Sequence, residues 1–120
     1  MKYEFETSFL DCVDEVQNVA MEIYGRYNLE KSMLWMTEEF GEFFKSIRKG
    51  ESKERITEEM GDLLAWILCM GNILDIRVAD AIEMTMKKEI NRQLEVYHKL
   101  KYSSNLKYLD IAVEEKAPNR

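Results

Sequence analysis

Apolar residues recur at helical spacing along most of the chain, and this pattern predicts four helices. The predicted helices run over about Glu4–Tyr24, Lys31–Lys49, Ser52–Leu74 and Val78–Tyr102. Gly50 is expected to end the second helix, and Ser52 is expected to cap the third. Residues 75–77 form a short connection, so the third and fourth helices should pack as an antiparallel hairpin. Strand-like alternation is nearly absent, and we therefore predict an all-α fold, an antiparallel four-helix bundle.

The size of the chain fits one small domain. Its 120 residues are 46% apolar, which is enough to bury a small core. We expect the helical domain to span residues 1–103 and a polar tail to span residues 104–120. The tail carries apolar positions that could form a docking arm, namely Leu106, Tyr108, Leu109, Ile111 and Val113. No apolar run is long enough to cross a bilayer and no leader follows Met1, so a cytoplasmic protein without a membrane partner is expected.

Charge and cysteine content narrow the class of partner. The net charge of −6 argues against nucleic acid held by simple electrostatics, because such binding needs a basic face. A polyphosphate ligand would need metal ions to offset its charge. Cys12 and Cys69 lie far apart in apolar helical stretches, without the close spacing of a zinc or redox pair. Both are therefore predicted to be packed thiols.

Two short acidic motifs stand out from this helical background. They read Glu39-Phe40-Gly41-Glu42 and Glu59-Met60-Gly61-Asp62. Within each motif the two acidic residues are one helical turn apart and share a face. Four carboxylates arranged in this way would repel one another unless a hard cation lay between them. The pattern therefore predicts a magnesium site whose candidate ligands are Glu39, Glu42, Glu59 and Asp62.

Glu59 is the most informative of these acidic residues. It falls inside the apolar arc of the third helix, beside Leu63 and Met70, so we expect its side chain to be buried. A buried carboxylate must be protonated, paired or bound to metal, because removing it from water costs several kcal/mol. The alternative to a metal ligand is a structural ion pair with Arg55, one turn earlier. Glu38 points away from the apolar arc and is expected to be solvated or to assist the site.

The same residues resemble a known family. The runs Trp35–Glu42 and Glu58–Leu64 are similar to the all-α nucleoside triphosphate pyrophosphohydrolases of the MazG type, whose signature is Glu-x-x-Glu, a spacer and Glu-x-x-Asp. Lys88-Glu-Ile-Asn91 looks like the lysine and asparagine on the family's following helix. The resemblance covers about Ser32–Arg92. It implies a magnesium cofactor, with Mn²⁺ as a substitute, and triphosphate or metal-shell contacts from Lys88 and Asn91.

The resemblance implies a reaction in which a nucleoside triphosphate becomes a monophosphate and pyrophosphate. Glu39, or its neighbour Glu38, would orient a water molecule and accept its proton as the water attacks the α-phosphorus. Trp35 lies over the carboxylates on the second helix and could stack a nucleobase; the alternative is an aromatic residue of the core or of an interface. Lys45, Arg48 and Lys49 could hold phosphate oxygens; the alternative, which has at least equal weight, is that they are solvated residues at a helix end, where the helix dipole favours basic side chains.

Self-association is expected for a helical domain of this size. Trp66, Cys69 and Ile73 lie beyond the main apolar arc of the third helix and would need covering. The resemblance also implies a homodimer or a homotetramer with sites near subunit interfaces.

Two other functions remain open. One is phosphoribosyl-ATP pyrophosphohydrolase of histidine biosynthesis, and the other is a non-catalytic helical interaction module whose carboxylates bind a structural cation.

Overall fold

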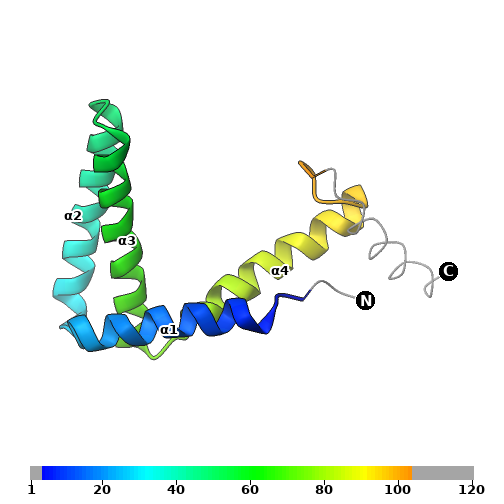
Figure 1. The fold of residues 1–120 in the computed structure, drawn as a ribbon, viewed down its shortest axis with the longest axis horizontal. Coiled ribbons are helices and arrows are strands. Elements are labelled where there is room, and N and C mark those ends of the chain that lie inside the picture. Colours follow the sequence, from blue (N-terminus) through cyan, green and yellow to red (C-terminus); the bar gives the residue numbers. More distant parts are fainter. Residues whose placement is uncertain (1–3, 104–120) are drawn as a thin grey trace. The chain divides into compact units, whose positions relative to one another are not determined.

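The computed structural model describes residues 4–103, and four α-helices account for most of them (Figure 1). The helices are α1 (Thr7–Tyr24), α2 (Leu29–Arg48), α3 (Lys53–Leu74) and α4 (Val78–Tyr97). No strand occurs within residues 4–103, so the predicted all-α class is confirmed. The proposed docking arm of residues 104–120 lies outside the described residues. No helix in the described part of the chain is both long and apolar enough to span a membrane.

The helix ends follow local chemistry that the sequence shows. The Asn28 side chain accepts a hydrogen bond from the Lys31 backbone N–H at 2.9 Å, and the Ser52 hydroxyl accepts one from the Arg55 N–H at 3.1 Å. These side chains satisfy backbone donors that the first turn of a helix leaves open. Gly50 adopts a φ of +65° just after α2, which a glycine does without strain. The predicted roles of Gly50 and Ser52 are therefore confirmed.

The described chain divides into two compact units. One comprises residues 11–79, and the other comprises residues 4–10 with residues 80–103. In the second unit Phe5 and Leu100 pack against Ile90 and Leu94 of α4, and the Lys87 ammonium lies 2.9 Å from the Glu4 carboxylate. In the first unit α2 and α3 run side by side in opposite directions, joined by a short turn (Figure 1). This antiparallel pair positions the acidic motifs.

The predicted hairpin of α3 and α4 stays a prediction, because α4 belongs to the other unit from Asp80 onward. Within residues 11–79, α2 and α3 are the pair of helices that packs along its length. The turn before α4 is fastened to α1. The Val78 backbone N–H donates to Gln17 Oε1 at 2.8 Å, and the Arg77 guanidinium pairs with the Asp14 carboxylate at 2.7 Å. These contacts hold the start of α4 against α1, which the spacing of apolar residues does not reveal.

We use the name α2–α3 seam for the covered stripes that the two helices share. They recur at intervals of three and four residues, as expected where two helices pack at a small angle. On α2 the stripe consists of Ser32, Met36, Glu39, Phe43 and Ser46, and on α3 it includes Ile56, Glu59, Leu63, Trp66 and Met70. Each acidic motif therefore contributes one residue, Glu39 or Glu59, to the seam.

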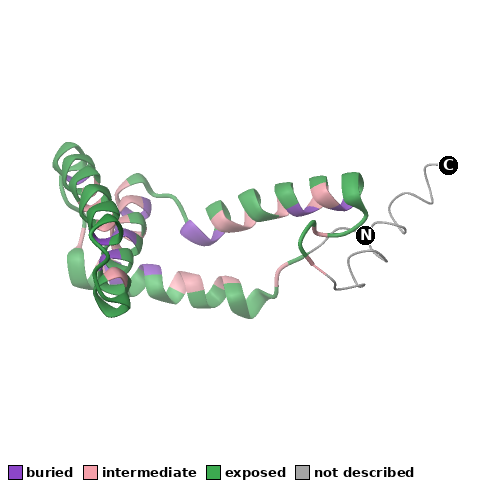
Figure 2. Cartoon of the chain, turned by 90° about the horizontal axis from the view of Figure 1, so that it is seen from above, coloured by how far each residue is buried: buried purple, intermediate pink, exposed green. Residues whose placement is uncertain are grey.

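Much of the apolar surface of α2 and α3 is not covered (Figure 2). We use the name outer apolar stripe for exposed residues on one face of this helix pair: Met33, Phe40, Phe44 and Ile47 of α2 and Met60, Leu64 and Ile67 of α3. Their helical positions place them about a quarter turn from the seam. By contrast, Trp66, Cys69 and Ile73, which the sequence suggested would need a partner, are half-buried or buried within the chain. That part of the prediction is wrong, and the uncovered apolar residues are different ones.

Candidate functional site

Three carboxylates meet on the helix pair formed by α2 and α3. Glu39, Glu42 and Glu59 each offer one oxygen, and these oxygens lie within 4.8 Å of one another. Glu39 and Glu42 share a face of α2, and Glu59 approaches from α3. Glu39 Oε2 and Glu59 Oε2 are buried, and neither finds a hydrogen-bond partner among the described residues. Buried anionic oxygens without donors are costly, so this arrangement suits a cation.

The electrostatics of Glu39 reflect this crowding. Burial raises the pKa of the Glu39 carboxyl above its usual value, because it favours the neutral form. The charges of Glu42, Asp62, Glu59 and Glu38 raise the pKa further, in that order. A cation among these groups would reverse the effect by favouring the ionised form. Glu39 is therefore a group whose protonation is coupled to the occupancy of the cluster.

Glu59 is buried as predicted, with 3% of its surface exposed. The ion pair with Arg55 that we weighed as the alternative is also present, with Arg55 Nη2 2.5 Å from Glu59 Oε1. The arginine side chain is 53% exposed and also contacts Glu58 at 3.1 Å. It therefore satisfies Oε1 of Glu59 and leaves the buried Oε2 without a hydrogen-bond partner among the described residues. The ion pair and a metal site are compatible, because one oxygen of Glu59 stays available to a cation.

The remaining acidic candidates lie beside the cluster. Asp62 is exposed and does not belong to the group of three close oxygens, but its charge acts on Glu39. Glu38 is also exposed and also raises the Glu39 pKa through its charge. Asp62 as a fourth ligand and Glu38 as a catalytic base stay predictions.

A pocket with a volume of about 330 Å³ adjoins the cluster on one side. We call it the aromatic pocket, and its lining is Tyr24, Tyr27, Trp35, Glu39, Asp62, Ala65, Trp66 and Cys69. The Trp35 ring lies 6.0 Å from Trp66 and 6.1 Å from Tyr27, measured between centroids, with the Tyr27 contact edge to face. Trp35 was predicted to lie beside the carboxylates, whereas the roles of the two tyrosines were missed. The sequence feature that could have indicated their role is the placement of two tyrosines on either side of Gly25 and Arg26, at the end of α1.

A second pocket of about 260 Å³ adjoins the cluster on its other side. We call it the basic pocket, and its lining is Glu42, Lys45, Ser46, Lys49, Glu51, Arg55 and Glu59. Of the three basic residues that the sequence offered as candidates for phosphate contact, Lys45 and Lys49 lie in this lining and Arg48 does not. Glu39 lines the aromatic pocket, and Glu42 and Glu59 line the basic pocket. The three carboxylates thus connect a pocket rich in aromatic residues with one that carries three basic side chains beside three acidic ones.

Lys88 and Asn91 lie on α4, in the unit that includes residues 80–103. Lys88 is exposed, and Asn91 Oδ1 is buried without a hydrogen-bond partner among the described residues. The carboxylate cluster and both pockets form from residues 11–79 alone. Contact of Lys88 and Asn91 with a substrate stays a prediction.

The two cysteines differ from one another. Cys69 is buried as predicted, lines the aromatic pocket, and has a pKa that burial raises. Cys12 is exposed, so the prediction of a packed thiol is wrong there. A cysteine thiol is small and tolerates contact with water at little cost.

The donor set fits a hard divalent cation. Carboxylate oxygens are the ligands that Mg²⁺ prefers, and it keeps open positions for water and phosphate oxygens when few protein groups bind it. Three close oxygens, together with one buried oxygen on each of Glu39 and Glu59 that lacks a donor among the described residues, satisfy this requirement. Glu39, Glu42 and Glu59 are therefore the residues that would hold such an ion.

Comparison with known proteins identifies the family of this chain. The family model described as the MazG nucleotide pyrophosphohydrolase domain matches residues 27–97, which is more than half of the 120 residues. The matched range includes both acidic motifs, Trp35 and the Lys88 to Asn91 segment. No curated protein and no solved structure matches the chain. On the strength of the family match, and in agreement with its four helices and paired acidic motifs, the chain belongs to the MazG nucleotide pyrophosphohydrolase domain family.

Proposed function

We propose that this protein is a magnesium-dependent nucleoside triphosphate pyrophosphohydrolase. The reaction would convert a ribonucleoside or deoxyribonucleoside triphosphate to its monophosphate and pyrophosphate. The observation that carries the proposal is the position of the three carboxylates, which lie between the aromatic pocket and the basic pocket. Membership of the family supports a pyrophosphohydrolase activity in general.

The two pockets match the two ends of such a substrate. The aromatic pocket has the volume and the rings to take a nucleobase, which would stack on Trp35. The basic pocket offers Lys45, Lys49 and Arg55 to the terminal phosphates. A triphosphate lying between them would pass directly over the carboxylates. Lys88 and Asn91 are proposed as further triphosphate contacts because they fall in the matched range.

Glu39, Glu42 and Glu59 would hold Mg²⁺, with Asp62 as the proposed fourth ligand. When bound, the ion would neutralise phosphate charge and lower the pKa of a bound water. Mn²⁺ would substitute because it accepts the same oxygen ligands.

Glu39 is the proposed base. Its carboxylate would orient a water molecule and take its proton while the water oxygen forms a bond to the α-phosphorus. The bond between the α-phosphorus and the oxygen that bridges it to the β-phosphorus breaks, and pyrophosphate leaves with that oxygen. An oxygen of Glu39 that does not bind the metal would accept this proton. Glu38, which is adjacent in sequence, is the second candidate for this role.

We also propose that the protein works as a homodimer or homotetramer. The outer apolar stripe leaves large side chains exposed, including Phe44 at 57% and Leu64 at 56%. A second copy that covers this stripe would remove them from water. Covering it would leave the carboxylate side of the helix pair open to substrate.

The decisive experiment is a substrate panel with and without Mg²⁺. Ordinary ribonucleoside and deoxyribonucleoside triphosphates and phosphoribosyl-ATP are incubated with the protein, and pyrophosphate and nucleotide products are measured. We expect pyrophosphate and a monophosphate from at least one triphosphate, with loss of turnover in EDTA and recovery with Mg²⁺ or Mn²⁺. Preference for phosphoribosyl-ATP would select the histidine-biosynthesis alternative. Release of single phosphates would reject the stated bond cleavage, and no release above a control without protein would favour a non-catalytic interaction module.

A further inference from the structure

The connection between α1 and α2 supplies part of the aromatic pocket. Tyr24 is the last residue of α1, and Tyr27 lies three positions later; both line the pocket. Gly25 between them has a φ of +65°, which turns the chain sharply. Tyr27 is 53% exposed, so packing alone does not fix its ring. Something else must hold the ring edge against Trp35.

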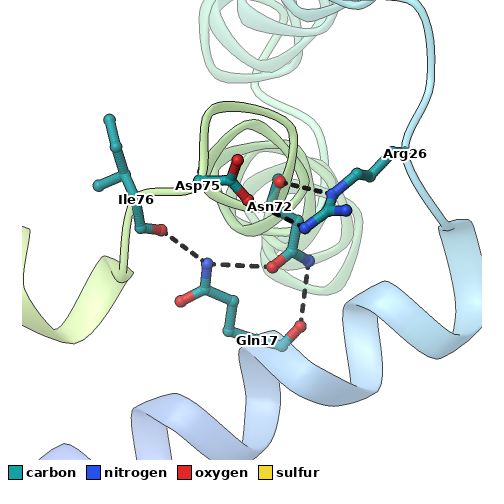
Figure 3. Close-up of polar contacts among 5 residues, drawn as sticks. All are labelled: Gln17, Arg26, Asn72, Asp75 and Ile76. Atoms are coloured by element: carbon teal, nitrogen blue, oxygen red, sulfur yellow. Dashed lines mark hydrogen bonds and ion pairs between the residues drawn. The ribbon is translucent and has the colours of Figure 1, made fainter.

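Arg26, between the two tyrosines, extends to the end of α3 (Figure 3). Its Nε donates to the Asn72 carbonyl oxygen at 3.0 Å, and its Nη2 lies 2.9 Å from Asp75 Oδ1. The Asn72 carbonyl belongs to the last turn of α3, where no intrahelical donor remains. The guanidinium therefore caps α3, and a cation at a helix C-terminus is favourable.

The anchor that Arg26 uses is itself firmly held. Asn72 Nδ2 donates to the Gln17 carbonyl oxygen at 3.1 Å, and Gln17 Nε2 donates to Asn72 Oδ1 at 3.1 Å and to the Ile76 carbonyl oxygen at 2.9 Å (Figure 3). A Cβ atom at Gly71 would come within 2.8 Å of Gln17 Nε2, so the Gln17 side chain packs directly against α3 at a position where a larger residue would force a shift. The end of α3 is thus a rigid point.

We propose that Arg26 is a positioning residue for nucleotide binding. By fastening the connection between α1 and α2 to the end of α3, it holds Tyr27 against Trp35 and sets the shape of the aromatic pocket. This inference rests on the proposed function, because it assigns the pocket to the nucleobase. The Arg26 and Asp75 side chains are 58% and 80% exposed, so the ion pair contributes little to folding stability. Its removal should therefore alter the pocket more than the free energy of unfolding.

The test is Arg26→Ala in the full chain. The protein's two tryptophans, Trp35 and Trp66, both line the aromatic pocket, so tryptophan fluorescence reports on this site. We expect the emission of the free variant to change as Tyr27 loosens. Binding of a triphosphate with a non-hydrolysable bridge between its α- and β-phosphorus should weaken by up to about tenfold, the value of one aromatic contact. KM should rise by a similar factor, while kcat and the urea midpoint stay near those of the parent.

Arg77→Ala is the matched control. Arg77 also joins the end of α3 to α1, through the Asp14 carboxylate at 2.7 Å, but it does not lie between the pocket tyrosines. This variant should bind the analogue as the parent does. Arg26→Lys should recover part of the affinity, because an ammonium can reach one acceptor but not both in the same geometry.

Parent-like emission and affinity in Arg26→Ala would overturn the proposal, and so would equal weakening in Arg26→Ala and Arg77→Ala. If the parent neither binds nor hydrolyses any nucleotide, the proposed function fails. In that case, changed tryptophan emission in Arg26→Ala alone would still establish that Arg26 holds the aromatic wall. The two failures are thus distinguishable.

Discussion

Two buried polar clusters within residues 11–79 differ in whether their groups have partners. Gln17 and Asn72 are 6% and 8% exposed; the Gln17 side-chain amide donates to Asn72 Oδ1, and both side chains also bond to backbone groups. Glu59 is 3% exposed, yet one of its oxygens lacks a donor among the described residues, as does one oxygen of Glu39. A satisfied polar cluster stabilises and specifies a fold, whereas an unsatisfied one has a cost. The difference separates a structural junction from a candidate site.

Arginine has a different role in each cluster. In the cluster of Gln17 and Asn72, Arg26 caps the end of α3 by donating to the Asn72 carbonyl oxygen and to Asp75 Oδ1. Arg55 reaches the second from solvent and contacts only one oxygen of Glu59. A cation that binds the cluster would therefore meet free oxygens on Glu39 and Glu59 without first displacing the guanidinium. The following predictions test this distinction.

The largest effect is expected from Glu59→Gln. Turnover should fall by about 10²–10³-fold or more, the range for removing a group that stabilises charge in the transition state. The metal-free variant should be as stable as the parent or more stable, because it loses a buried charge and Arg55 keeps water and Glu58 as partners. Thermal melts with and without Mg²⁺ and assays of pyrophosphate release would measure both quantities.

The stabilisation that added Mg²⁺ gives to the parent and to Glu59→Gln provides a second measurement. Saturation at 100 times the dissociation constant should stabilise the parent by about 2.7 kcal/mol, and this gain should shrink in Glu59→Gln. Marked destabilisation of the metal-free variant, with activity retained, would return Glu59 to a structural ion pair with Arg55.

The next effect concerns self-association through the outer apolar stripe. Phe44→Glu places a charge in the outer apolar stripe and should weaken self-association at least about tenfold, since burial of a phenylalanine contributes about 1.5–3 kcal/mol. Light scattering at micromolar concentration would measure it. Leu34→Glu is the control, because Leu34 is similarly exposed, at 60%, but lies on α2 outside the stripe. A parent that is monomeric and fully active would contradict the proposed assembly.

A substitution in the cluster of Gln17 and Asn72 should change the free energy of unfolding and leave metal binding unchanged. Asn72→Ala removes the two hydrogen bonds between the Asn72 side chain and Gln17 and should lower the free energy of unfolding by about 1–3 kcal/mol, because each buried bond contributes about 0.5–1.5 kcal/mol. Urea unfolding would measure the loss, with Asn18→Ala, an exposed position on α1, as the control. Unchanged stability in Asn72→Ala would show that this junction contributes nothing to the fold.

The smallest effect is a dependence of stability on pH. The Glu39 pKa is raised in the folded protein, so the folded state favours the neutral acid. Its stabilising contribution is complete below the unfolded value of 4.5 and is lost as pH rises through the folded pKa. Urea unfolding of the metal-free protein across this range should show the loss, and Glu39→Gln should flatten it.

The pKa of Glu89 on α4 is shifted in the opposite direction, so its effect on the pH dependence of stability has the opposite sign. A hydrogen bond from Arg92 lowers the Glu89 pKa to about 2, so its contribution is present above 4.5 and is lost as pH falls toward 2. Glu89→Gln should therefore leave the loss of stability above pH 4.5 intact. If it flattens that part of the profile as Glu39→Gln does, the assignment to Glu39 is wrong.

Local patterns in the sequence determined a large part of this protein. Four helices, the caps at Gly50 and Ser52, the burial of Glu59 and the family all follow from features that span a few turns or fewer. Periodicity shows which residues share a face of a helix, and capping depends on side chains within one turn. Such features do not depend on the distant packing of the chain.

Only the tertiary structure decided which faces meet. The most apolar arc of α2, with Phe40 and Phe44, is exposed, whereas the seam uses Ser32, Glu39 and Ser46 on an adjacent face. Small serines allow the backbones of two helices to approach, a property that hydrophobicity does not measure. The periodicity likewise could not reveal that the turn before α4 binds α1, or that Tyr24 and Tyr27 reach the pocket beside Glu39. These contacts join residues tens of positions apart, and their choice depends on shape and on the pairing of polar groups across the whole unit.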